Sequence, residues 1–360
     1  MPGPRARLEE DSLVVDLGSE YTVLSTVSGL TRSRYLVFHH VDKGFSVRDV
    51  ESYRRRVAEG LGLPANTPVF ITAVEPGDHL VLRGSGVAVV ATVGLRPPVC
   101  IEQEMLYDPP APSTINVAVL VEEAVLSMPA LVDLLRVAAE AKAVASSLLL
   151  LRCRGRPAGT VTDAIAVAAR TGPRGLPWAG MATRLGNQAA RLVYEAVLQG
   201  DKRSPGERLR DVLGLGPEEL LDDMAKMYTQ APVPGVGPGE ARRMLEEMLS
   251  RVLRDPNVWA FLVAARELDI HGAAGTLPGI SRREFLGDSR GIVADEALAS
   301  ALAVYIAGFR GLLSAYWVDR SKHRAGLRLA ELPPFEDDAA AALAGALLSR
   351  LYDRLLGTGV

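Results

Sequence analysis

A stretch dense in proline and glycine divides this chain into two parts of different composition. The stretch is Ala231–Gly239, APVPGVGPG, and it can form neither a helix nor a central strand. Before it, short runs rich in β-branched residues alternate with helical segments, whereas every segment after it has helical spacing. We therefore predict an α+β protein. Residues 1–230 would form a mixed α/β domain with a central sheet, and residues 240–360 an all-α domain.

The predicted strands of the first domain are separated by Gly, Pro, Asp or Asn. They are Ser12–Leu17, Thr22–Val27, Tyr35–His40, Val69–Val74, His79–Leu82, Gly86–Val93, Ile115–Val121 and Ala164–Ala168. Helices are predicted over Val47–Glu59, Pro129–Leu150 and Thr183–Leu198. The helices predicted in the second domain are Glu240–Leu253, Pro256–Leu268, Arg282–Phe285, Val293–Gly308, Leu312–Asp319 and Glu336–Leu356.

Composition excludes several classes of protein. A net charge of −3 over 360 residues lacks the clustered basic excess of a nucleic-acid-binding protein. Cys100 and Cys153 lack a CxxC spacing, so we expect two buried thiols in a reducing cytoplasm. No apolar signal sequence is expected at the N-terminus. The apolar stretch Ala297–Val318 is interrupted by Arg310, which favours a buried helix pair over a stable membrane span. A homo-oligomer is compatible with the sequence.

Three polar groups interrupt apolar elements of the first domain. They are Ser113-Thr114-Ile115-Asn116, Glu140-Ala141-Lys142 and Thr160-Val161-Thr162-Asp163. Polar groups in apolar surroundings need partners, or their ionisation is shifted. One interpretation is a structural ion pair between Lys142 and either Glu140 or Asp163. The other is an acid–base cluster at the ends of strands, where clefts commonly form.

Two pairs of adjacent carboxylates open apolar helices of the second domain. They are Asp295 with Glu296, and Asp337 with Asp338. Between them, Asp319 and Lys322 are three residues apart and share a face if the segment is helical. Acids in a first helical turn can simply cap free amides. Three acidic corners held by buried helices also suit Mg²⁺, bound together with the phosphate of a substrate.

The three polar groups of the first domain resemble motifs of a known family. STIN, EAK and GTVTD occur in the order and approximate spacing of adenosylcobinamide amidohydrolases, and the resemblance covers roughly residues 20–200. It extends to Ile71–Ala73, Ala91–Leu95 and Ala182–Gly186. This resemblance implies adenosylcobinamide as the substrate, with hydrolysis of the amide that joins aminopropanol to the corrin side chain. No protein-bound metal is expected in this domain.

Two mechanisms are open for such an amide hydrolysis. In the first, Asp163 or Glu140 acts as general base for water, while Lys142 and Asn116 hold or polarise the amide oxygen. In the second, a threonine at Thr160 or Thr162 is the nucleophile and Lys142 activates it. A covalent corrinoid adduct would separate the two mechanisms.

The second domain resembles a different family. VADE, YIAG, DRSK and LPPFEDD, between Val293 and Asp338, look like motifs of the α-ribazole-phosphate phosphatases, relatives of the phosphatidylglycerophosphatase A family. The resemblance covers roughly Gly239 to the C-terminus, and fusion of these two activities is a known arrangement in archaea. It implies α-ribazole phosphate as a second small-molecule substrate.

The resemblance also implies roles for the acidic corners of the second domain. One or two Mg²⁺ would be held by Asp295, Glu296, Asp337 and Asp338. Lys322 would neutralise the phosphate, and Asp319 would orient that lysine or add a metal ligand. An alternative is a corrinoid-binding module joined to a metal-dependent phosphatase that acts on a lipid or another phosphate monoester.

Overall fold

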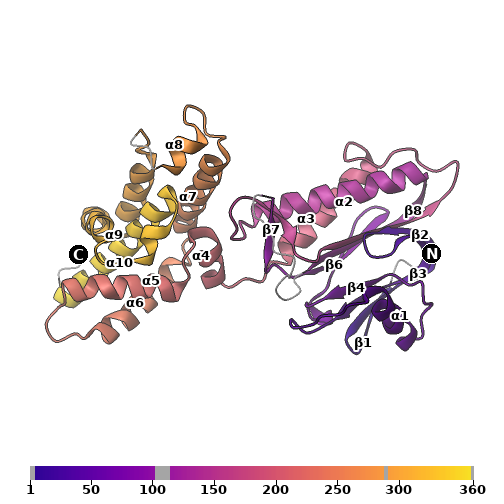
Figure 1. The fold of residues 1–360 in the computed structure, drawn as a ribbon, viewed down its shortest axis with the longest axis horizontal. Helices are drawn as coiled ribbons and strands as arrows, with labels where there is room; N and C mark the ends of the chain where they lie inside the picture. Colours follow the sequence, from indigo (N-terminus) through magenta and orange to yellow (C-terminus); the bar gives the residue numbers. More distant parts are fainter. Residues whose placement is uncertain (1–4, 102–113, 288–290, 358–360) are drawn as a thin grey trace. The chain divides into compact units, whose positions relative to one another are not determined.

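The computed structural model describes residues 5–101, 114–287 and 291–357 (Figure 1). Contacts divide the chain into two units, Met1–Lys202 and Arg203–Val360. The α+β class is confirmed, with a sheet in the first unit and helices in the second. The division lies before α4 (Pro205–Leu213) and α5 (Pro217–Gln230), whereas the sequence analysis placed the boundary after them. Both helices pack on later helices of the second unit, so the proline-rich stretch only joins α5 to α6.

The central sheet of the first unit has the strand order β4-β3-β2-β10-β8-β6-β5, and β1 pairs with β2. The pairs β8–β10 and β3–β4 are parallel, and the other pairs are antiparallel. The bounds are β1 Arg5–Glu9, β2 Ser12–Ser25, β3 Gly29–His40, β4 Val69–Thr72, β5 Leu80–Arg83, β6 Val87–Val93, β8 Ile115–Leu126 and β10 Ala164–Thr171. A separate ribbon pairs β7 (Pro98–Cys100) with β9 (Pro157–Thr160).

The sheet is curved enough for its inner face to pack on itself. Phe38 and Phe70, on β3 and β4, share one buried cluster with Leu120 of β8. Thr114, just before β8, donates to the Thr72 hydroxyl of β4 at 3.1 Å, although four steps of the strand order separate these strands. The outer face is covered by α2 (Met128–Leu148) and α3 (Arg184–Gln199), and α1 (Val50–Gly60) lies outside β2–β4 (Figure 1).

The two cysteines of the first unit form a disulfide, which differs from the prediction. Cys100 and Cys153 were expected to be separate thiols, but the structure joins them, with Cα atoms 6.2 Å apart. Pairing of β7 with β9 brings the two cysteines together across 53 residues of sequence. The spacing of the cysteines along the chain gives no sign of this long-range contact, so the prediction of two free thiols is wrong.

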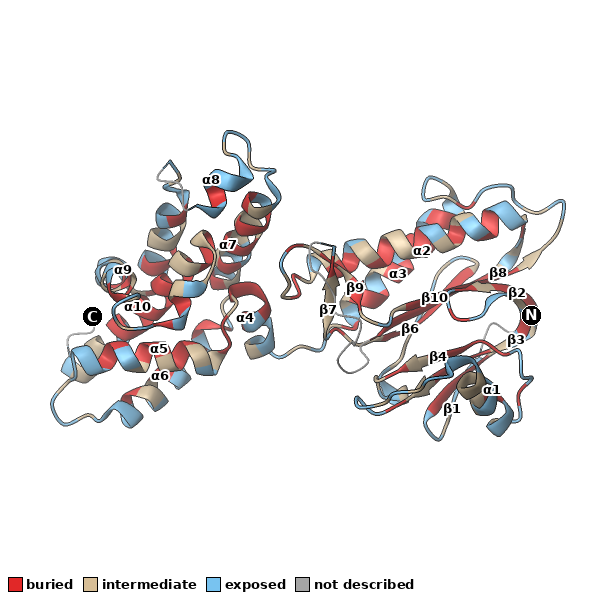
Figure 2. Ribbon diagram, viewed as in Figure 1, coloured by how far each residue is buried: buried red, intermediate tan, exposed pale blue. Residues whose placement is uncertain are grey.

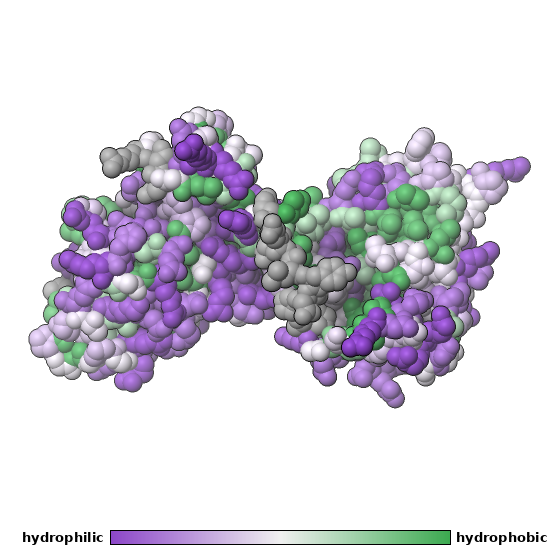
Figure 3. Space-filling view, viewed as in Figure 1, coloured by the Kyte–Doolittle hydropathy of each residue, from purple (hydrophilic) through white to green (hydrophobic). Residues whose placement is uncertain are grey.

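The helix α10 (Pro334–Leu356) is the centre of the second unit (Figure 2). It is buried on nearly every side between Phe335 and Leu351, and small residues let its neighbours approach closely. At Gly345, for example, a Cβ atom would overlap the backbone of Ala315. The remaining helices are α6 Pro238–Val252, α7 Pro256–Ala274, α8 Arg282–Leu286 and α9 Ala294–Ser321. On the face drawn in Figure 3 this unit is mainly hydrophilic, in keeping with an apolar interior.

The helix α9 reverses its direction near its middle. Ala307 and Gly308 have non-helical backbone angles, and Gly308 has a φ of 64°. The two arms lie against each other, since a Cβ on Gly311 would come within 2.6 Å of the Ala303 carbonyl oxygen. By length and composition α9 could cross a membrane, and 28% of its most apolar window is buried. Each arm, however, is shorter than the roughly 20 residues that a span requires.

Candidate functional sites

A buried ion pair lies at one end of the sheet in the first unit. Lys142 projects from α2, and Asp163 immediately precedes β10. The Lys142 ammonium contacts Asp163 Oδ2, and the two side chains are only 10% and 13% exposed. The same ammonium donates to the Ala158 carbonyl oxygen at 3.2 Å. The pair therefore links α2 to the connection between β9 and β10.

The carboxylate of Asp163 collects several further donors. Its Oδ1 accepts the Ile115 amide at 2.8 Å and the Thr160 hydroxyl at 2.5 Å. Its Oδ2 accepts the Thr160 amide at 3.0 Å. These contacts fix the start of β8 and the end of β9 to the same group. We refer to Lys142, Thr160 and Asp163 as the ion-pair cluster.

Gly159 is a site residue that sequence reasoning did not single out. A Cβ atom at this position would overlap both Asp163 Oδ2 and the Lys142 ammonium. Only glycine lets the β9 backbone pass this close to the ion-pair cluster. The sequence did offer a signal, because Gly159 is the first residue of the GTVTD motif. A glycine at such a position is also common in ordinary turns, so this signal alone did not identify a site residue.

Two other predicted residues lie outside the ion-pair cluster. Glu140 is 43% exposed and accepts from Arg136 Nη1 at 2.6 Å. Residues that are two positions apart in a helix lie on nearly opposite faces, so Glu140 points away from the sheet when Lys142 points toward it. Thr162 is exposed in the turn between β9 and β10. Of the two acids considered as partners for Lys142, the structure selects Asp163.

Asn116 lies on the other face of the sheet from Lys142. Its neighbours Ile115 and Val117 pack with α2 and α3, so strand alternation directs Asn116 to the inner face. There its Nδ2 donates to the Ile71 carbonyl oxygen at 3.2 Å. Its Oδ1 and the hydroxyl of Thr92, its cross-strand partner, have no hydrogen-bond partner among the described residues. Ser113, the first residue of the STIN motif, lies outside the described residues.

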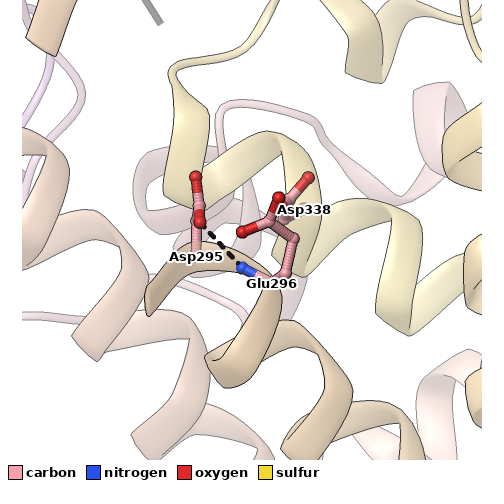
Figure 4. A group of neighbouring side chains, drawn as sticks. All are labelled: Asp295, Glu296 and Asp338. Atoms are coloured by element: carbon pink, nitrogen blue, oxygen red, sulfur yellow. Dashed lines mark hydrogen bonds between the residues drawn. The ribbon is translucent and has the colours of Figure 1, made fainter. Parts of the chain in front are cut away.

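The second unit brings three predicted carboxylates together (Figure 4). Oxygen atoms of Asp295, Glu296 and Asp338 all lie within 4.8 Å of one another. The first two begin α9 and the third lies near the start of α10, so two helices build the group. We call these three residues the acid cluster. The predicted convergence of acids from separate helices is therefore present in the fold.

Lys322 lies beside the acid cluster and contacts three carboxylates. Its ammonium is 2.7 Å from Asp319 and 3.8 Å from Asp338, and it also contacts Asp337. Burial opposes its charge, but hydrogen bonds to Asp319 and Asp337 raise the pKa of Lys322. Asp337, predicted as a metal ligand, lies outside the group of three and pairs with this lysine. Its other oxygen, Oδ1, has no hydrogen-bond partner among the described residues.

The electrostatics of the acid cluster suit a divalent cation. Burial and a hydrogen bond with Glu296 raise the pKa of Asp295 to about 7. Burial also raises the pKa of Asp338 to about 7, although Lys322 opposes this shift. The pKa of Asp337 is raised to about 6, again chiefly by burial. Crowded, partly buried carboxylates of this kind are hard oxygen donors, and a bound cation would offset their repulsion.

Two solved structures and one uncharacterised protein each match part of this chain. The match to low temperature requirement C protein from Listeria monocytogenes covers 42% of this chain and 94% of the Listeria chain, with 24% sequence identity and a TM-score of 0.35. The match to a protein of unknown function from Bacillus stearothermophilus covers 43% of this chain and 98% of the Bacillus chain, with 19% sequence identity and a TM-score of 0.34. An uncharacterised protein of Methanocaldococcus jannaschii is 31% identical over 116 residues, which are 31% of this chain and 86% of that protein.

Sequence comparison places the first unit in a family. An adenosylcobinamide amidohydrolase of Halobacterium salinarum is 36% identical over 149 residues, which are 40% of this chain. The chain spans 62% of the length of that relative. The family model described as adenosylcobinamide amidohydrolase matches residues 3–208, more than half of the 360 residues. The chain therefore belongs to the adenosylcobinamide amidohydrolase family.

Proposed function

We propose that the first unit hydrolyses adenosylcobinamide to adenosylcobyric acid and aminopropanol. The observation that carries this proposal is the family match over residues 3–208, which includes every strand of the first unit. The ion-pair cluster adds chemical support. It joins Lys142 of the EAK motif to Thr160 and Asp163 of the GTVTD motif, and it holds the first residue of β8.

The hydrogen bond between Thr160 and Asp163 favours a threonine nucleophile. The Thr160 hydroxyl donates to Asp163 Oδ1 at 2.5 Å, so a proton acceptor is already in place. In this route the Thr160 oxygen attacks the amide carbon, Asp163 takes the hydroxyl proton and aminopropanol leaves with a proton. Water then hydrolyses the ester. Lys142 is paired with Asp163, so it holds this acceptor and does not itself take the proton. The rival route has Asp163 activating water directly.

The two routes differ in what Thr160 must supply. We expect Thr160→Val to abolish aminopropanol release and Thr160→Ser to retain part of it if the hydroxyl is the nucleophile. Mass spectrometry of acid-quenched wild-type protein should then show an adduct of corrinoid mass on the peptide that contains Thr160. Full activity of Thr160→Val would exclude the threonine route. Absence of aminopropanol release from the wild-type protein would exclude the proposed activity itself.

We propose that the second unit removes phosphate from α-ribazole 5′-phosphate with the aid of Mg²⁺. The observation that carries this proposal is the acid cluster, in which carboxylates from two helices converge beside a partly buried lysine, Lys322. Asp295, Glu296 and Asp338 would hold the metal. Bound Mg²⁺ would offset phosphoryl charge and lower the pKa of an attacking water.

The protein's own groups would bind and orient the phosphate. Lys322, partly buried next to the acid cluster, offers the positive charge. Asp319 and Asp337 hold its ammonium from two sides and so fix its direction. In this assignment Asp337 is a positioning group, a change from the metal-ligand role predicted from the sequence.

A lipid phosphate monoester is a second candidate substrate for this unit. The observation that favours it is the set of apolar side chains that α9 exposes. Phe309 is 69% exposed, Leu313 55% and Tyr316 59%. Parallel assays with α-ribazole phosphate, phosphatidylglycerophosphate and a simple aryl phosphate would rank the candidates by kcat/KM.

Chelation tests the metal in the complete chain. With EDTA present, we expect phosphate release to stop and aminopropanol release from adenosylcobinamide to continue. Added Mg²⁺ should restore the first activity. Phosphate release that persists after removal of all divalent cations would contradict the assignment of the acid cluster.

A further inference from the structure

The start of α10 cannot cap itself. The residue before the helix is Pro333, which makes no side-chain cap, and the first helical residue is Pro334, which has no amide hydrogen. The next two amides, those of Phe335 and Glu336, therefore need acceptors from elsewhere in the fold. Both residues are fully buried, so water does not supply these acceptors.

A carboxylate from α7 accepts both amides. Asp269 Oδ1 receives the Phe335 amide at 3.1 Å, and Asp269 Oδ2 receives the Glu336 amide at 2.8 Å. One turn earlier on the same face of α7, Arg266 donates to Glu336 Oε1 at 2.9 Å. Exposure is 2% for Asp269, 4% for Arg266 and 0% for Glu336.

This arrangement is costly if capping is its only purpose. A serine or aspartate in place of Pro333 would satisfy an amide locally, worth about 1 kcal/mol. Burying three charged side chains carries a desolvation penalty of several kcal/mol per ion, which their mutual attraction must offset. What the buried network adds is a direct link between the first turn of α10 and a second, rigid helix.

The residues that follow this turn belong to the proposed phosphatase site, and one of them, Asp338, is a proposed metal ligand. Asp337 and Asp338 come directly after Glu336, and Asp338 must lie within 4.8 Å of the two acids of α9. Each residue of a helix turns the side-chain direction by about 100°. A small rotation of the first turn of α10 would therefore carry Asp338 out of the acid cluster.

We propose that Asp269, supported by Arg266, is a positioning residue that sets the rotation of the start of α10 and so completes the divalent-cation site. The inference rests on the proposed metal-dependent function of the second unit. Asp269 touches neither the acid cluster nor Lys322 through any described hydrogen bond or ion pair. Its effect is transmitted through the backbone amides of α10. Groups that orient metal ligands in this way typically change metal affinity by about 10- to 100-fold.

The test compares two matched substitutions in the full-length chain. In Asp269→Asn the single carbonyl oxygen can no longer accept both amides in the same geometry. The control is Asp223→Asn, because Asp223 is also fully buried and accepts a backbone amide, that of Leu329, at 3.0 Å. Mn²⁺ affinity is measured by calorimetry, and the thermal midpoint of each variant reports its stability. We expect Asp269→Asn to weaken Mn²⁺ binding at least tenfold and Asp223→Asn to change it less than twofold.

The outcomes separate this inference from the function on which it rests. Wild-type protein that binds no Mn²⁺ would overturn the metal site itself. Wild-type binding with an unchanged affinity in Asp269→Asn would overturn only the positioning role. Equal weakening in both variants would mean that lost stability explains the effect, which also overturns it. If Asp269→Asn does not fold, Arg266→Lys provides the milder test, with at least a threefold loss of Mn²⁺ affinity expected and no loss refuting the inference.

Discussion

Replacing Asp163 with asparagine should destabilise the first unit through the charge that it leaves behind. Asp163→Asn keeps the size of the side chain but removes the anion that faces Lys142, whose side chain is only 10% exposed. The contacts described for the ammonium would then be reduced to the Ala158 carbonyl oxygen at 3.2 Å. Removing one partner of a buried ion pair typically costs about 3–5 kcal/mol.

The same reasoning predicts that a second substitution recovers stability. Lys142→Met removes the stranded charge, so the double variant with Asp163→Asn should lose only about 1–2 kcal/mol, the scale of ordinary lost hydrogen bonds. The double variant should therefore be about 2–3 kcal/mol more stable than Asp163→Asn alone, so the effects of the two substitutions should not add. Amide hydrolysis should be absent from both Asp163→Asn and the double variant, since neither has the carboxylate that accepts the Thr160 proton.

Native-state hydrogen exchange can locate this loss in a chain of two units. We expect faster exchange in peptides that cover β8 and β10, because Asp163 bonds the first amide of β8 and directly precedes β10. Peptides from α10 in the second unit serve as the internal control and should not change. A cost below about 1 kcal/mol for Asp163→Asn, or additive effects in the double variant, would show that the ion pair does not hold these strands together.

Three further predictions concern Gly159, Glu140 and the pH dependence of metal binding. Gly159→Ala should abolish amide hydrolysis and destabilise the first unit, because its Cβ would overlap the ion pair; Gly77→Ala, with open space around it, is the control in the same assays. Glu140→Gln should leave aminopropanol release within about twofold of wild type, since Glu140 is exposed and bonded to a surface arginine. Mg²⁺ affinity, followed by calorimetry, should fall as pH drops from 8 to 6, because Asp295 and Asp338 have pKa values raised to about 7 and protons then compete with the metal. A pH-independent affinity would contradict this last prediction.

Local patterns in the sequence predicted much of the fold correctly. Helical periodicity identified α2, α3 and α10, and the break in α9 agrees with the two separate helices predicted at Val293–Gly308 and Leu312–Asp319. Acid pairs at the starts of two buried helices indicated that carboxylates could converge. Such features depend on spacings of a few residues, which a single sequence displays directly.

Features that depend on distant contacts could not be predicted in this way. The ribbon of β7 and β9, and with it the joining of Cys100 to Cys153, requires pairing across more than 50 residues. Which face of the sheet Asn116 occupies depends on which helices cover that sheet. Which acid pairs with Lys142 was likewise open, because Glu140 is near in sequence whereas Asp163 is near only in space.

Because α9 reverses its direction at Gly308, a single continuous segment of the chain supplies both the acid cluster and Lys322. All of these residues lie between Asp295 and Asp338, and the turn brings the two ends of α9 to the same end of α10. Contacts separated by so few residues close quickly, because little chain entropy is lost in forming the intervening loop. The carboxylates and the lysine should therefore approach one another early when the second unit folds, and the site should be complete only once Asp269 of α7 has bound the amides of α10.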